Sequence, residues 1–215
     1  MLVLETRGLS KIYGSKGKGK GIAVKALDDF SINVKEGEFV EIMGPSGSGK
    51  TTLLNILATI DSPSSGEVYI KGQNPHKLDK DDLALFRRKN LGFIFQDFNL
   101  LDTLSVKENI ILPLVLEGRS QKEIEKKLMD MANILNIQDI LNKRTYEISG
   151  GQQQRTACAR ALINDPSIIL ADEPTGNLDS KASMDLMESL ETINRKRGAT
   201  IVMVTHDAFA ASFCN

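Results

Sequence analysis

Apolar residues in the first part of the chain form short runs that are typical of strands, and turn-rich stretches separate them. Five runs read as strands, at residues 2–7, 23–34, 38–43, 66–72 and 91–96. The runs within residues 2–43 predict an antiparallel β layer that leads into a glycine-rich loop. The last run, LGFIFQ, is a buried strand that ends in a polar residue.

Helical spacing replaces the strand pattern between residues 97 and about 150. Ser120 and Glu123 match a capping box, in which two side chains cap each other's backbone amides at a helix start. Apolar residues follow at helical intervals, at Ile124, Leu128, Met131 and Leu135. We interpret residues 97–150 as a helical insertion into a single domain over residues 1–215, whose remainder is residues 1–96 and 151–215.

Strands and helices alternate after the insertion. The pattern predicts helices and strands in turn, at 150–163, 167–171, 180–197 with an end at Gly198, 200–204, and a helix from near Asp207. Such alternation indicates a mostly parallel sheet with ligands at the carboxyl ends of its strands. The expected fold class is therefore α/β, and no internal repeat is visible.

The glycine-rich loop carries a specific chemistry. GPSGSGKT at residues 44–51 matches G-x-x-x-x-G-K-[ST], in which backbone N–H groups surround phosphate oxygens while the lysine and the hydroxyl reach the terminal phosphate and Mg²⁺. The loop lies between a β-prone run and a helix-prone run, so a helix N-terminus faces the phosphates. This context disfavours Lys50 as a mere surface charge. The pattern predicts a P-loop site that binds a nucleoside triphosphate through Gly44, Pro45, Ser46, Gly47, Ser48, Gly49, Lys50, Thr51 and Thr52.

Two adjacent carboxylates end a later apolar run. Asp172 follows SIILA, so its side chain emerges at a strand tip, where it can hold Mg²⁺ together with Thr51. Glu173 points in a different direction and can face an attacking water as general base. The alternative is a solvated loop start, which the buried strand before it disfavours.

Composition and charge limit the possible partners and cellular location of the chain. The net charge of -1 and the pI near 6.2 do not indicate the basic surface that nucleic-acid binding needs. The two cysteines are too few for a disulfide framework. Cys158 is expected to be a core residue. No apolar run reaches the length of a membrane span, so we expect a cytosolic chain that meets a membrane only through partners. GSKGKGKG at 14–21 reads as a solvated loop, with an anion-binding role as the alternative.

A second helix start resembles an anion-binding site. ISGGQQQR at 148–155 places Ser149, Gly150 and Gly151 where a helix presents bare N–H groups. One triphosphate cannot easily use two such ends in one compact domain, so two chains arranged head to tail would explain both. A simple helix cap is the alternative.

The phosphate loop, SGGQ, LADEP and VTHD occur in that order, and with them the chain resembles the ATP-binding-cassette ATPases over essentially its whole length. The resemblance implies a P-loop NTPase with a RecA-like core, ATP and Mg²⁺ as cofactors, an ATPase activity and a homodimer that forms on ATP binding. It also implies that Ser149, Gly150, Gly151 and Gln152 form the signature that contacts ATP held by the opposite subunit.

The resemblance assigns further roles to single residues. Tyr13 corresponds to an aromatic residue that stacks on adenine, with a core tyrosine as the alternative. Gln96 corresponds to a glutamine that links Mg²⁺ and the attacking water to the helical insertion. His206 corresponds to a switch histidine that touches the γ-phosphate and takes part in catalysis, with a satisfied core histidine as the alternative. A loop that crosses the dimer interface is formed by Asn177, Leu178 and Asp179.

Two features depart from the usual family pattern. The signature begins with Ile148 instead of leucine, a volume-conserving swap that should be harmless. The chain ends at Asn215, soon after His206, which suggests a truncated or minimal C-terminal end.

Transport is the expected use of the cassette, because the long coiled-coil insertions, zinc sites and duplicated cassettes usual in its non-transport uses are not in the sequence. Residues 86–114 resemble cassettes that serve macrolide-exporter-like and lipoprotein-releasing permeases, which remain the alternative. FIFQDFNLLDTLSVKENI and VTHDAFAASFCN are more similar to bacitracin- and lantibiotic-resistance cassettes. The resemblance implies an ATPase at the cytoplasmic face of the cell membrane that drives export or detoxification of antimicrobial peptides through a separate permease.

Overall fold

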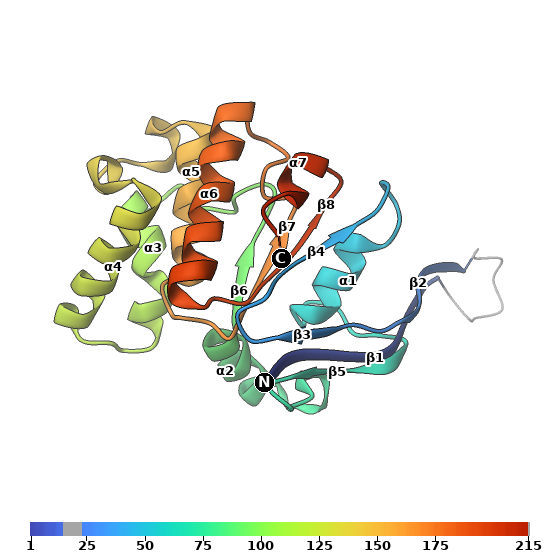
Figure 1. The fold of residues 1–215 in the computed structure, drawn as a ribbon. Helices are drawn as coiled ribbons and strands as arrows, with labels where there is room; N and C mark the ends of the chain where they lie inside the picture. Colours follow the sequence, from blue (N-terminus) through green and yellow to red (C-terminus); the bar gives the residue numbers. More distant parts are fainter. Residues whose placement is uncertain (15–22, 215) are drawn as a thin grey trace.

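The computed structural model describes residues 1–14 and 23–214 (Figure 1). It contains an antiparallel sheet, a parallel sheet and helices around both, which confirms the α/β P-loop fold predicted from the sequence. The glycine- and lysine-rich loop predicted at 14–21 lies, except for Gly14, outside the described residues.

The antiparallel sheet is built around one long strand. β1 pairs with three neighbours, and the four members are β1 (Leu2–Tyr13), β2 (Val24–Phe30), β3 (Asn33–Lys35) and β5 (Ser65–Ile70). The prediction ended β1 at residue 7 and was wrong there. Gly8 has a φ of +58°, and register shifts accompany it, so the strand bends at a bulge and continues to Tyr13.

The parallel sheet has the order β4-β8-β7-β6, with β4 (Phe39–Met43), β6 (Leu91–Ile94), β7 (Ile168–Asp172) and β8 (Ile201–Thr205). The prediction placed the run 38–43 in the antiparallel layer, but β4 pairs with β8 in parallel register. A segment that precedes the glycine-rich loop must end at the ligand edge of the parallel sheet, which explains the correction. The carboxyl ends of β4 and β7 therefore flank that of β8.

Seven α-helices lie in the described residues: α1 (Lys50–Leu57), α2 (Lys80–Asn90), α3 (Val106–Leu116), α4 (Gln121–Leu135), α5 (Gly150–Leu162), α6 (Ser180–Arg197) and α7 (Ala208–Ala211). Short 3₁₀ helices occupy Pro75–Lys77, Gln138–Ile140 and Thr145–Glu147. The bounds predicted for α6 are confirmed, and Gly198 ends it with a φ of +66°.

The capping box predicted at Ser120 is only half present. The Ser120 hydroxyl accepts from the Glu123 amide, but the Glu123 carboxylate accepts from Arg119 instead of turning back to Ser120. Complete capping boxes occur at Ser105 with Glu108 and at Ser149 with Gln152. The arginine competes for the carboxylate because it lies immediately before the cap.

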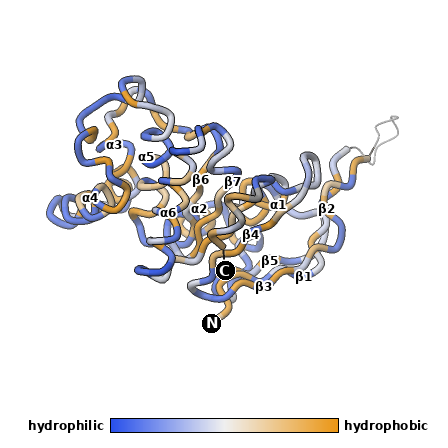
Figure 2. Tube along the Cα trace, turned by 45° about the horizontal axis from the view of Figure 1, so that its top comes forward, coloured by the Kyte–Doolittle hydropathy of each residue, from blue (hydrophilic) through white to orange (hydrophobic). Residues whose placement is uncertain are grey.

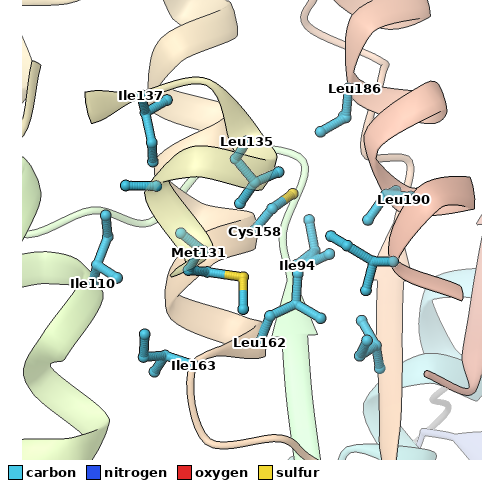
Figure 3. Close-up of a cluster of buried hydrophobic side chains, with 14 of the residues drawn as sticks. Ile94, Ile110, Met131, Leu135, Ile137, Cys158, Leu162, Ile163, Leu186 and Leu190 are labelled. Carbon is cyan, nitrogen blue, oxygen red and sulfur yellow. The ribbon is translucent and has the colours of Figure 1, made fainter. Parts of the chain in front are cut away.

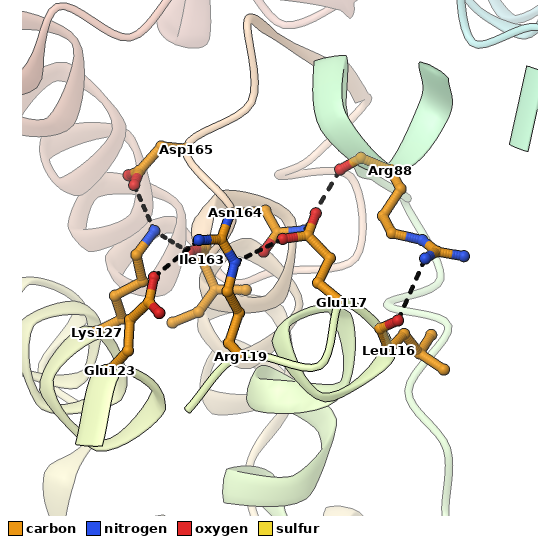
Figure 4. A network of polar contacts seen from close by, with 9 residues as sticks. All are labelled: Arg88, Leu116, Glu117, Arg119, Glu123, Lys127, Ile163, Asn164 and Asp165. Carbon is orange, nitrogen blue, oxygen red and sulfur yellow. Dashed lines mark hydrogen bonds and ion pairs between the residues drawn. The ribbon is translucent and has the colours of Figure 1, made fainter. Parts of the chain in front are cut away.

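Arg119 also belongs to a polar network that joins the C-terminal ends of α2, α3 and α5 to the first half of α4 (Figure 4). Its guanidinium contacts Glu117 at 2.9 Å, and the Asn164 amide donates to Glu117 and to the Arg88 carbonyl. Lys127 donates to the carboxylate of Asp165 at 2.6 Å. The network connects the two helices of the predicted insertion to the elements that flank it.

Two hydrophobic clusters cover the two faces of the parallel sheet. On β7, Ile169 and Ala171 face the cluster shared with α3, α4, α5 and α6, whereas Ile168 and Leu170 face the cluster shared with α1 and the antiparallel sheet. Figure 1 shows α1 between the two sheets, and Figure 2 shows hydrophobic positions along the strands and hydrophilic ones around α4.

Cys158 lies in the first cluster, fully buried beside Met131 and Leu162 (Figure 3). Burial raises the pKa of its thiol to about 12. The prediction of a core cysteine is confirmed.

Candidate active site

The glycine-rich loop between β4 and α1 can be formed only with glycine at critical positions. Gly47 and Gly49 have φ values of +80° and +90°. A Cβ at Gly49 would lie 2.2 Å from the carbonyl oxygen of Ala26, and one at Gly44 would lie 2.6 Å from the Ser48 hydroxyl. The loop is therefore held close to β2 and close to itself.

Lys50 begins α1 and is buried, with 8% of its surface exposed. Its Nζ donates to the carbonyls of Gly44 at 2.7 Å and of Pro45 at 2.9 Å. The ammonium group is thereby held against the loop that precedes the helix. Thr51 and Thr52 follow in the first turn, where the helix N-terminus contributes a partial positive charge.

Thr51, in the first turn of α1, contacts Asp172 at the end of β7. The threonine hydroxyl lies 3.4 Å from Oδ1 of Asp172, the last residue of β7. The pKa of Asp172 is raised chiefly by burial, and the charge of Glu173 raises it further, whereas Thr51 and Lys50 act in the opposite sense. The carboxylate is thus placed where a bound cation would stabilise its ionised form.

Glu173 follows in a strained backbone conformation, with a φ of +42°. Its amide donates to the Val204 carbonyl at 2.9 Å, so β8 holds the residue that follows β7. Its Oε1 lies 3.1 Å from Nδ1 of His206, whose side chain is 63% exposed. The alternative of a core histidine is therefore wrong, and a cavity of about 590 Å³ opens beside Glu173 and His206.

Gln96 lies two residues beyond β6 and contacts the loop after Glu173. The Asn177 amide donates to the Gln96 carbonyl at 3.1 Å and to Oδ1 of Asp97 at 3.0 Å. A Cβ at Gly176 would lie 3.0 Å from the side-chain nitrogen Nε2 of Gln96. Asp179 then caps α6 through the Ala182 amide. The loops that follow β6, β7 and β8 therefore meet at one edge of the sheet.

The SGGQ segment forms a separate surface at the N-terminus of α5. The Ser149 hydroxyl accepts a hydrogen bond from the backbone amide of Gln152, and the side-chain oxygen of Gln152 accepts one from the backbone amide of Ser149. A Cβ at Gly151 would lie 2.9 Å from that of Ala182, so the segment packs against α6. A groove of about 320 Å³ is lined by residues 149–151 and 177–179.

Tyr13 ends β1 as an exposed residue, so the alternative of a core tyrosine is wrong. Its hydroxyl donates to Asp61 at 2.7 Å, and the ammonium of Lys11 lies 4.9 Å from the ring centroid while donating to the same carboxylate. These two contacts hold the ring, and the residue stays 42% exposed. The sequence analysis missed Asp61 and Lys11, because no motif marks them.

The model of the ABC transporter family matches residues 27–176 of this chain. The chain belongs to the ABC transporter family. It is 59% identical over 214 residues to the Bacillus subtilis uncharacterized ABC transporter ATP-binding protein YvcR, covering 100% of this chain and 82% of the relative. It is 53% identical over 215 residues to the Halalkalibacterium halodurans bacitracin export ATP-binding protein BceA, covering 100% and 83%.

Solved structures of related cassettes have the same fold. The dimeric structure of MJ0796, an ABC transporter cassette, superposes with a TM-score of 0.88 at 44% identity, covering 98% of this chain and 91% of that one. A dimeric post-hydrolysis state of MJ0796 with ADP and phosphate gives 0.87 at 43% identity, with the same coverage.

The cassette is therefore the ATP-binding, ATP-hydrolysing subunit of an ABC transporter. None of the helices in residues 1–14 and 23–214 combines the length and apolar character that a membrane span needs.

Replacing Asp172 by asparagine should stabilise the nucleotide-free cassette at neutral pH. A carboxyl whose pKa is raised by folding contributes its stability below its unfolded pKa, and that contribution is lost as the pH rises through the folded pKa. Asparagine carries no such charge, so its thermal midpoint should exceed that of wild type at pH 7, and the difference should shrink as the pH falls toward the folded pKa. Thermal unfolding without Mg²⁺ measures this, with exposed Asp130→Asn as control. A lower midpoint at pH 7 would contradict it.

Proposed function

We propose that this cassette drives export or detoxification of antimicrobial peptides through a separate permease. The observation that carries the proposal is a sequence identity of 53% over all 215 residues to a relative named as a bacitracin export ATP-binding protein. The arrangement of Gln96, Glu173 and His206 at one sheet edge supports ATP hydrolysis as the source of energy.

We assign the binding steps to the loop and the residues beside it. Lys50 neutralises the terminal phosphates of ATP, and Tyr13 stacks on adenine. The hydroxyl of Thr51, the carboxylate of Asp172 and the amide of Gln96 supply the oxygen ligands that Mg²⁺ prefers. Mg²⁺ commonly takes one or two carboxylates together with phosphate oxygens and water, and Asp172 supplies one such carboxylate beside Thr51.

We assign the hydrolysis step to Glu173 and His206. The Glu173 carboxylate accepts a proton from the attacking water, and Nδ1 of His206 at 3.1 Å orients that carboxylate toward the γ-phosphate. The carbonyl of Val204 accepts a hydrogen bond from the Glu173 amide, so β8 fixes the backbone of the base while His206 contacts its side chain.

Two copies of the cassette form the working unit in this proposal. Ser149, Gly150, Gly151 and Gln152 lie against α6, in a groove shared with residues 177–179. A second copy placed head to tail brings its phosphate loop to this groove, so that each ATP is held by both chains. The dimeric structures of MJ0796 support a dimer of cassettes as the working unit.

The permease would hold the cassette at the cytoplasmic face of the cell membrane. Apolar residues after Gln96 are candidates for the contact, with packing of the helical insertion as their alternative use: Phe98, Leu100, Leu101 and Leu104. Leu101 is 47% exposed, which supports the contact for this residue.

A second candidate substrate class is that of a macrolide exporter or a lipoprotein-releasing system. The chain is 44% identical over 210 residues to a Hyphomonas neptunium macrolide export ATP-binding/permease protein, MacB, but it spans 32% of that relative's length. The lower identity makes this the weaker candidate.

Deleting the gene should lower the inhibitory concentration of bacitracin or of a lantibiotic several-fold, because the pump then lacks its ATPase. Wild-type cassette supplied from a plasmid should restore resistance, whereas the Glu173→Gln form should not. Unchanged sensitivity to these peptides, together with loss of macrolide export or lipoprotein release, would favour the second candidate and leave the ATPase intact.

A further inference from the structure

One buried side chain holds the two loops that carry Gln96 and Glu173. Nε2 of Gln154, in the second turn of α5, donates to the carbonyl of Phe95 at 3.2 Å and to the carbonyl of Pro174 at 2.8 Å. Phe95 directly precedes Gln96, and Pro174 directly follows Glu173. A single amide group therefore fixes the backbone on both sides of the proposed hydrolysis site.

The chemistry of this position is unusual for a residue that only packs. Gln154 is 0% exposed, and its Oε1 has no hydrogen-bond partner among the described residues. Burying an amide oxygen without a partner opposes folding. An apolar side chain of equal length would avoid that cost, so the two donated bonds are the feature that a glutamine supplies here.

The same helix holds the loop after β6 at two further points. The guanidinium of Arg160 donates to the carbonyl of Asn99 at 2.8 Å and to that of Phe98 at 3.1 Å. Phe98 and Asn99 have φ values of +60° and +49°, a conformation that non-glycine residues rarely adopt. Residues 95–99 are thus kept in a strained path by α5, whose N-terminus also presents Ser149.

We propose that Gln154 is a positioning residue for ATP hydrolysis, which sets the separation of Gln96 and Glu173 without touching the nucleotide. The proposal rests on the roles proposed above for those two residues. Misplacing reacting groups by about 1 Å can reduce a rate by roughly a hundredfold. Loss of the two bonds should therefore reduce turnover, while ATP binding through Lys50 and Tyr13 on other elements is kept.

The test compares Gln154→Met with Gln153→Met. Methionine keeps the length and removes the donors. Gln153 is the matched control, because it lies on the same helix and its amide donates at 2.8 Å to Thr145, away from both loops. For Gln154→Met we expect kcat to fall by roughly tenfold to a hundredfold, with KM and the affinity for an ATP analogue close to wild type. Gln153→Met should hydrolyse ATP as wild type does.

A wild-type kcat for Gln154→Met, or a rise in KM with kcat unchanged, would overturn the proposal. If Gln154→Met shows no cooperative thermal transition, Gln154→Asn takes its place, because it keeps the amide but shortens its reach, and the same loss of kcat is expected. Glu173→Gln is measured in parallel. Normal hydrolysis by Glu173→Gln would refute the role of Glu173 itself, whereas an inactive Glu173→Gln beside a normal Gln154→Met would refute only the role of Gln154.

Discussion

Replacing Glu173 by glutamine should reduce ATP hydrolysis by roughly a hundredfold or more, the typical contribution of a general base. The amide keeps the shape of the carboxylate and its place beside His206, but it cannot accept a proton from water. ATP binding should persist, because Lys50 and the loop before it are unchanged, and the stalled protein should collect as an ATP-bound dimer. Single-turnover hydrolysis measures the chemical step, and size-exclusion chromatography with ATP measures the dimer.

Glu188→Gln is the matched control for this change. Glu188 is an exposed acid on α6, so the same loss of one charge occurs away from the sheet edge. Its hydrolysis should equal that of wild type. A wild-type single-turnover rate for Glu173→Gln would remove Glu173 from the mechanism.

The sequence predicted correctly those features that are determined by residues close together in the chain. Asp179 as a cap and Gly198 as a terminator bracket α6, and the pattern gave the correct bounds. The phosphate loop was also predicted correctly, because positive φ values and close approach to neighbouring atoms require glycine in it. The prediction missed α2, although Asp79 caps it and Asp81 and Asp82 follow in its first turn. Its weakly apolar composition hides the helical period.

Features set by tertiary structure could not be predicted in the same way. The bulge at Gly8 reads as a turn in the sequence, and only pairing with three neighbours shows that β1 continues. The contact of His206 with Glu173 depends on β7 and β8 being adjacent in the sheet. Gln154 falls within a motif that predicts a helix start, and its two bonded carbonyls come from segments 59 and 20 residues away.

Replacing Ser149 by arginine should abolish hydrolysis while each chain still binds ATP. Ser149 is exposed at the N-terminus of α5, and a long cationic side chain there would occupy the groove proposed to receive the nucleotide of the second copy. The phosphate loop on the other side of the sheet edge is untouched. Binding of a fluorescent ATP analogue and steady-state hydrolysis separate the two effects.

Loss of a helix cap is a competing explanation, and Ser120→Arg controls for it. Ser120 caps α4 through the Glu123 amide just as Ser149 caps α5 through Gln152. Replacing either serine should cost about 1 kcal/mol of stability. Only Ser149→Arg should lose hydrolysis, because only its cap lies in the proposed dimer interface. Equal activity losses in both variants would indicate a general destabilisation.

Mixing Ser149→Arg with Lys50→Ala chains tests whether the site is composite. In a mixed dimer, one site combines the intact loop of the Ser149→Arg chain with the intact signature of the Lys50→Ala chain, and the other site carries both defects. If chains pair at random in a two-fold dimer and the sites act independently, an equal mixture should recover about a quarter of wild-type hydrolysis. Each variant alone should be inactive, since Lys50→Ala loses the charge that binds the terminal phosphates. No recovery in the mixture, or normal hydrolysis by Ser149→Arg alone, would contradict the head-to-tail arrangement.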